Sequence, residues 1–147
     1  MYILSNEEPV SEVTEELDPI LQFCVFCDSV TPASDKKHVF SGVFDLIMRP
    51  IVVPQFFIAL RWINGRGSHT SKLRILDPDL KAVFETEEIP FKLPHRVHPH
   101  DAVFQLSNFH FSMKGVYWVE ILLNGESHTS IPLPVRESPG KSLRTAA

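Results

Sequence analysis

The chain has 147 residues, of which 44% are hydrophobic, and a formal net charge of −4 at pH 7. A single domain of this size buries roughly 68–70% of the surface of its unfolded chain and needs no disulfide or metal to be stable. No apolar run approaches the roughly 20 residues of a membrane span, and acids stand at the N-terminus where a signal peptide has bases. We therefore expect a cytoplasmic protein with no membrane partner.

Charge is unevenly distributed along the chain. Residues 1–18 carry acidic side chains and no Lys or Arg, whereas the rest is close to neutral. We expect this acidic extension to be a short helix or disordered, since it has few apolar residues to bury. No run of basic residues is present, so the sequence indicates no nucleic-acid partner.

The first part of the chain predicts two strands and a connector. Residues 20–28 read as a strand that is apolar on both faces, and residues 37–47 as a second strand. Gly42 within the second indicates a bulge or a close backbone approach. Residues 48–54, with a proline near each end, predict an apolar connector.

The middle of the chain predicts a hairpin. Two strand-like runs over residues 55–76 flank an Asn-Gly pair at 64–65, which is the strongest short-range hairpin signal. An Asp-Pro-Asp-Leu turn at 77–80 leads into a short strand at 81–85. Residues 86–100, with three prolines, are predicted to be irregular.

The last part predicts a further strand and a second hairpin. Apolar residues change face within the strand 102–112, near residues 107–108, which indicates a bulge. A second Asn-Gly pair, at 124–125, lies between the two strands of a hairpin over 115–136.

About seven to eight strands with little helix predict an all-β fold, an antiparallel immunoglobulin-like β-sandwich. The sandwich is expected over residues 19–136, between the acidic extension 1–18 and a flexible tail at 137–147. Pro132 and Pro134 cannot donate to a β-ladder, so the last strand is expected at a sheet edge or to end in a bulge.

Four short motifs together resemble a family of small bacterial proteins of unknown function. They are a Cys-Asp strand end at 27–28, a Gly-x-Phe-Asp strand at 42–45, an Asp-Pro-Asp turn at 77–79 and a Gly-x-Tyr hairpin at 115–117. The resemblance covers roughly residues 20–136. It implies an immunoglobulin-like sandwich and no particular activity.

A histidine-rich segment is the first candidate for chemistry. His95, His98, His100 and Asp101 lie within seven residues, and imidazole with carboxylate is a reasonable ligand set for zinc or another divalent metal. The alternative is an ordinary polar loop, and no cofactor is expected.

Two further features allow both a structural and a functional interpretation. The tetrapeptide Ser-His-Thr-Ser occurs after both Asn-Gly turns, so His69 and His128 form a paired site if the hairpins are neighbours, or simply begin two strands. Cys24 and Cys27 form a C-x-x-C, which is typical of redox or zinc sites. Inside a strand, however, side chains three residues apart point to opposite faces, which favours structural cysteines.

No nucleophile-and-base motif is present, so we expect no enzyme activity. Instead, apolar residues at predicted surface positions favour a protein-interaction or structural module that binds an unknown protein or a second copy of itself. The alternative is a metal- or small-molecule-binding sandwich that uses the histidine segment 95–101. The predicted interaction surface consists of Trp118, Glu120, Ile51, Val52 and Val53.

Overall fold

The computed structural model describes residues 15–137, and these residues form an all-β, antiparallel fold, as predicted. The described residues contain ten strands, more than the seven or eight expected, and one 3₁₀ turn. In the described part of the chain, no helix is long and apolar enough to cross a membrane. The elements are β1 (Ile20–Cys27), β2 (Ser29–Pro32), η1 (Ser34–Lys36), β3 (His38–Ser41), β4 (Ile51–Ile63), β5 (Gly67–Leu76), β6 (Ala82–Glu85), β7 (Ile89–Leu93), β8 (His100–Phe111), β9 (Gly115–Leu123) and β10 (Glu126–Val135).

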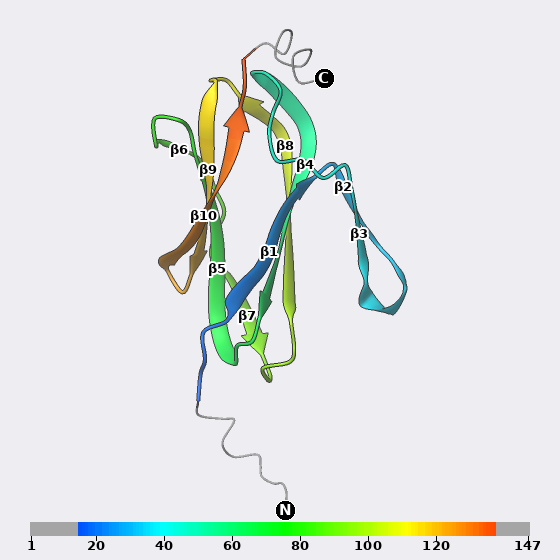
Figure 1. Ribbon diagram of the computed structural model, residues 1–147. Helices are drawn as coiled ribbons and strands as arrows, with labels where there is room; N and C mark the ends of the chain where they lie inside the picture. The colour runs from blue at the N-terminus through cyan, green and yellow to red at the C-terminus, as the bar shows by residue number, and fades with distance from the viewer. Residues whose placement is uncertain (1–14, 138–147) are drawn as a thin grey trace, which may run out of the picture.

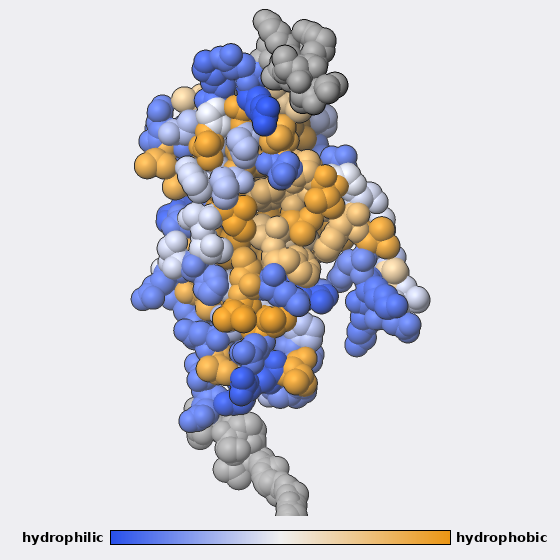
Figure 2. All heavy atoms as spheres, viewed as in Figure 1, coloured by the Kyte–Doolittle hydropathy of each residue, from blue (hydrophilic) through white to orange (hydrophobic). Residues whose placement is uncertain are grey.

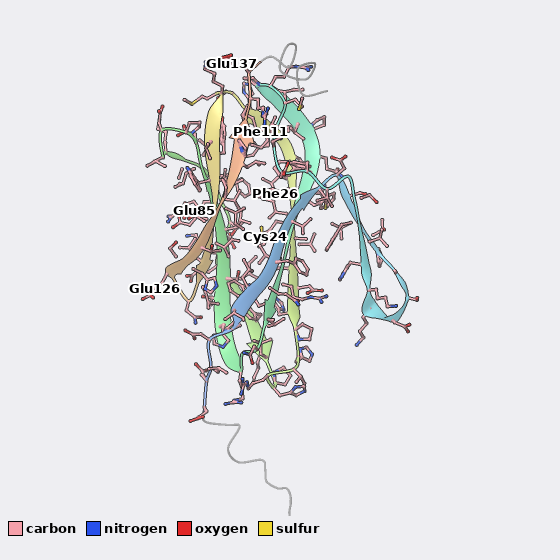
Figure 3. The ribbon with its side chains drawn as sticks, viewed as in Figure 1. Cys24, Phe26, Glu85, Phe111, Glu126 and Glu137 are labelled. Carbon is pink, nitrogen blue, oxygen red and sulfur yellow. The ribbon has the colours of Figure 1, made fainter. Side chains whose placement is uncertain are left out.

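The strands form two packed layers (Figure 1). One sheet has the order β1-β4-β8, and the other has the order β10-β9-β5-β6, with β7 also pairing with β5. Every second residue of the central strands points into the space between the sheets, where Phe26 and Phe111 also lie (Figure 3). The largest fully buried side chains are Trp62, Tyr117, Phe56, Phe111, Ile58 and Leu60.

A small hairpin, β2–β3, stands apart from the two layers (Figure 1). It lies over the outer face of the three-stranded sheet, where the ring of Phe40 is 5.9 Å from that of Phe23 on β1. His38 of the same hairpin reaches Asp101 on β8, with 3.5 Å between Nδ1 and Oδ2. The hairpin therefore covers part of the apolar outer face that the sequence of β1 predicted.

The second predicted hairpin is confirmed as β9–β10. Asn124 and Gly125 have φ angles of 52° and 84°, which a two-residue hairpin turn requires at both positions. Tyr117 is buried at the start of β9, and its hydroxyl oxygen accepts a hydrogen bond of 3.2 Å from the backbone N–H of Met113. Such a bond to the backbone upstream is the tyrosine corner of Greek-key sandwiches. β10 lies at a sheet edge, as its prolines predicted.

The first predicted hairpin is wrong. β4 and β5 belong to different sheets, so the segment with Asn64 and Gly65 crosses from one layer to the other. Asn64 has a φ of 63°, but Gly65 is not in the left-handed region, so the pair does not form the type I′ turn that Asn-Gly favours.

The crossing accommodates residues 15–19, which run across it as a strap. Leu17 and Arg66 exchange two backbone hydrogen bonds of 2.9 Å. A Cβ on Gly65 would lie 2.7–2.8 Å from atoms of Pro19, so only glycine allows this contact. Of the acidic extension, residues 1–14 lie outside the described residues, and the described remainder forms this strap rather than a helix.

Three smaller expectations also change. The strand predicted over 37–47 ends at Ser41, and the connector predicted over 48–54 joins β4 from residue 51 onward. The irregular segment 86–100 contains β7, whose Pro90 lies on the outermost strand of its sheet.

The apolar residues of β8 change face as predicted, but the predicted bulge is wrong, because the pairing with β4 shows no register shift. Asn108 has a φ of 50°, and the ladder between β4 and β8 skips the position where Pro54 faces it. Both strands switch face at this point, so the pairing keeps one register on either side.

We expect Gly65→Ala to lower the free energy of unfolding by about 1–3 kcal/mol, because its Cβ meets the backbone of Pro19. Gly125→Ala is the matched control, since it meets no atom closer than 3.9 Å and costs only backbone strain of about 1 kcal/mol. Urea denaturation measures both. A Gly65 variant as stable as the parent would show that the strap is not tightly held.

Candidate functional site

An apolar groove of about 500 Å³ lies between the start of β4 and the segment that precedes it. Figure 2 shows hydrophobic side chains gathered beside the upper part of β4, where this groove opens. Asp28, Gly42 and Arg49 contribute its polar border. The apolar lining consists of Val43, Phe44, Leu46, Ile47, Met48, Ile51 and Val53.

The floor of the groove is fixed to both sheets. The N–H of Phe44 donates to the carbonyl of Phe26 at 2.9 Å, and the Phe44 ring lies 5.8 Å from that of Phe56 in the core. Ile47 bonds to the end of β10, donating to the Pro134 carbonyl at 2.8 Å and accepting from the Arg136 N–H at 2.9 Å. The segment is therefore anchored at two points, which preforms the groove.

Parts of both walls of the groove are exposed to solvent. The side chain of Val43 is 62% exposed, and those of Met48 and Ile51 are also exposed. Exposed apolar residues that line one concave surface typically mark a binding site for an apolar partner group. At the border, Asp28 lies directly against Gly42, whose φ of 68° and lack of Cβ permit that contact.

The structure divides the predicted interaction surface between the two sheets. Ile51 and Val53 line the groove, whereas Val52 alternates to the other face of β4 and is exposed. Trp118 is half-buried on β9, between Leu76 of β5 and Pro132 of β10.

Glu120, next along the outer face of β9, accepts a hydrogen bond of 2.9 Å from Arg74 Nε and forms an ion pair with Arg74 Nη2 at 2.8 Å. This carboxylate is therefore engaged within its own sheet.

The sequence did not predict most of the second wall of the groove, which is formed by residues 43–48 and lies opposite Ile51 and Val53. An apolar run followed Gly42, but it resembles a continuing strand. The prolines at 50 and 54 marked the neighbouring segment, and they led to Ile51 and Val53 only.

The histidine segment is spread over several environments. The rings of His95 and His98 lie 5.8 Å apart, but His100 stacks on Phe91 with 4.3 Å between ring centroids. Burial lowers the pKa of His100, which favours the neutral form of its ring. Within residues 15–137, no three His, Cys, Asp or Glu side chains are placed to hold one metal ion.

Asp101, the fourth predicted ligand, forms an ion pair with Arg61 of β4. Arg61 donates from Nε to Oδ1 at 2.6 Å and from Nη2 to Oδ2 at 2.9 Å. This bidentate hydrogen bonding holds the pKa of Asp101 below its ordinary value. Because His38 also contacts this carboxylate, the pair fastens the β2–β3 hairpin to the sheet.

The two histidines of the repeated tetrapeptide lie beside the same pair of buried aromatic rings, Phe91 and Trp62. His69 is buried, and its Nε2 lies 2.9 Å from the Arg66 carbonyl oxygen. Its ring centroid is 5.8 Å from Phe91, which stacks on Trp62 at 6.3 Å. His128 is exposed, and its ring centroid lies 5.0 Å from that of Trp62. The two histidine rings thus contact different members of the aromatic pair, one from a buried position and the other from an exposed one.

The two cysteines are free and lie within β1, as the sequence predicted. Burial raises the pKa of the Cys24 thiol to about 12. Burial, with a smaller contribution from the Asp28 carboxylate, also raises the pKa of Cys27. Thiols of raised pKa are poor nucleophiles and poor metal ligands, which is consistent with a structural role.

Comparison with known proteins identifies the family. A model described as a family of unknown function (DUF6941) matches residues 22–136. The chain belongs to this family. Its matched region begins within β1 and ends just after β10, so it takes in the groove. No curated protein matches the chain.

Two solved structures match the chain with TM-scores below 0.5. Part of the β-D-glucoside glucohydrolase of Trichoderma reesei is 12% identical with a TM-score of 0.42, over 81% of this chain and 19% of that chain. The CARDB domain of a Pyrococcus furiosus protein, solved in complex with di-metal ions, is 8% identical with a TM-score of 0.39, over 88% and 99% of the two chains. The chain thus spans about a fifth of the glucohydrolase.

We expect Asp101→Asn to lower the free energy of unfolding at pH 7 by about 1 kcal/mol, allowing for partial solvent screening of the pair. The folded-state pKa of Asp101 is depressed, so its stabilising effect is full above the ordinary value of 3.8. That effect is lost as the pH falls through the folded pKa. Urea denaturation at several pH values measures it, with the exposed Asp45→Asn as control. A deficit that persists at the lowest pH would argue against the ion pair.

We expect both thiols of the native protein to react slowly with Ellman's reagent at pH 8. A pKa of about 12 leaves Cys24 with a thiolate fraction roughly a thousandfold below that of an ordinary cysteine. The same protein in denaturant should react rapidly at both residues. Rapid reaction of the folded protein would instead support a redox or metal role for the C-x-x-C.

Proposed function

We propose that the protein is a non-catalytic interaction module that binds a partner protein through the apolar groove at residues 43–53. The observation that supports this proposal is a preformed concave surface whose floor belongs to the core and whose walls are exposed and apolar. A partner that places one or two apolar side chains there would remove Val43, Met48 and Ile51 from water, which is the main favourable term in association.

The polar border of the groove suits recognition of a protein chain. Asp28 and Arg49 are the charged residues among those that line it, and the other lining residues except Gly42 are apolar. Interfaces typically combine an apolar centre with a polar rim that fixes orientation. A partner segment that combines apolar side chains with polar or charged residues matches this composition.

The same lining gives little support for catalysis. It provides one carboxylate and one guanidinium, and none of the Ser, Cys or His side chains that act as nucleophile or base in hydrolases. Metal binding by His95, His98, His100 and Asp101 stays a prediction that the geometry does not favour, since Asp101 is paired with Arg61. Of the two parts of the predicted surface, the groove is a better binding site than the half-buried Trp118.

The test uses a groove variant, Val43→Asp with Met48→Asp, because both side chains are exposed and their replacement leaves the core intact. Val97→Asp is the matched control, since Val97 is 84% exposed in the loop between β7 and β8. Each protein, together with Trp118→Ala, serves as bait in cross-linking capture from cells that produce it. The captured partner is then purified and titrated against each bait.

We expect the parent, Val97→Asp and Trp118→Ala to bind the same partner, and the groove variant to bind at least about tenfold more weakly. Melting temperatures of all four proteins should agree within a few degrees. A partner that binds the groove variant as tightly as the parent would contradict the proposal, as would capture of nothing by any bait. Loss of binding only in Trp118→Ala would move the interface to the other sheet.

A further inference from the structure

Within the described part of the chain, strand β8 leaves one of its edges unpaired over twelve residues. It pairs with β4 along its whole length, from His100 opposite Trp62 to Phe111 opposite Ile51. Among residues 15–137, no strand pairs with its other edge. A free edge presents a row of backbone N–H and C=O groups that can form a ladder with another chain.

In the described chain, the other edges of the two main sheets are protected. β10 carries Pro132 and Pro134, which remove two backbone donors, and its last residues bond to Ile47. β7 contains Pro90 and Lys92, and β6 has only four residues. β1 has an irregularity in its pairing between Leu21 and Phe23, and its end is held by the segment around Phe44. These are the devices by which natural sheets avoid edge-to-edge pairing.

β8 has none of these devices over most of its length. Its twelve residues include no Pro, Lys or Arg. Its one carboxylate, Asp101, is neutralised by Arg61 of the same sheet. The outer-face side chains that follow, Val103 and Gln105, are uncharged and exposed, with Val103 43% exposed. Pairing is regular from residue 100 to 107, before the positive φ of Asn108 interrupts it.

We propose that residues 101–107 of β8 pair antiparallel with the same residues of a second copy of this chain. The two three-stranded sheets would then join across a two-fold axis into one sheet with the strand order β1-β4-β8-β8-β4-β1. The second copy is the occupant that the edge itself favours, because it supplies a free strand of equal length. We expect a register in which Val103 of each copy lies opposite Gln105 of the other. This register places uncharged side chains opposite one another and keeps the two Asp101 carboxylates apart.

This interface is separate from the groove of the proposed function. Ile51 and Val53 of the groove lie beside Phe111 and Phe109, beyond Asn108. A dimer formed through residues 101–107 therefore leaves both grooves open. The two proposals can fail independently.

The test is the molar mass in solution, measured by sedimentation across a wide range of protein concentration. We expect a dimer for the parent and a monomer for Val103→Lys with Gln105→Lys, because like charges on facing strands oppose pairing. The matched control is Ser127→Lys with Ser130→Lys, which adds the same charge to exposed positions of β10. The control should dimerise like the parent, and the β8 variant at least about tenfold more weakly.

Hydrogen exchange of the parent gives a second readout that does not depend on a variant folding. Outward amides of residues 101–107 should be protected in the dimer and exchange faster on dilution, while β10 amides should not change. A parent that stays monomeric at every concentration would overturn the proposal, as would a dimer that the β8 variant leaves intact. Protection of β8 only on adding the partner captured through the groove would also overturn it and assign the edge to that partner. The groove variant should still dimerise.

Discussion

Strand β4 carries a large apolar side chain at every second position from Phe56 to Trp62, and all of them lie buried between the sheets. It is the middle strand of its sheet, so both β1 and β8 pair with it. A slip of one residue would turn the whole row toward solvent, which fixes the register of all three strands. The same register places Arg61 outward, 5.4 Å from the Phe23 ring and bonded to Asp101.

The groove arises where this alternation is interrupted. Pro54 has no N–H to donate, and the ladder skips the position where it faces Asn108. Because both strands change face there together, Phe109 and Phe111 pack around Phe56 while the sheet continues. Ile51 and Val53, which precede Pro54 in β4, form one wall of the groove. The floor beside this wall is held by backbone hydrogen bonds of Phe44 and Ile47, which keep the groove in place.

Features determined by local sequence were predictable, and those determined by distant contacts were not. The turn at Asn124-Gly125 was predicted because its two residues adopt the geometry that their neighbours require. Asn64-Gly65 has the same local signal, but Pro19 lies against Gly65 and the chain crosses to the other sheet. Likewise, the spacing of His95 to Asp101 says nothing of Arg61, which lies 40 residues earlier and takes up the carboxylate.

The candidate site shows the same division. Ile51 and Val53 were predicted to belong to the interaction surface because a proline flanks their segment on each side. Proline has no backbone N–H to donate to a β-ladder. Val43 and Met48 lie in an apolar run. The periodicity of that run does not distinguish a strand from an irregular segment that lines a groove. What distinguishes them is the anchoring of Ile47 to Pro134, a contact between segments far apart in the chain.

The Arg61–Asp101 pair links the fold to the proposed edge interface. Inside the protein it fastens β4 to β8 and, through His38, holds the β2–β3 hairpin against the outer face. At the edge, the same pairing removes the one full charge of β8, which would otherwise oppose a second strand. An unpaired Asp101 would protect this edge, as charged residues do on other edge strands. Its neutralisation from within the sheet therefore leaves a long, regular and uncharged edge, and a second copy of the chain is the partner that matches it in length.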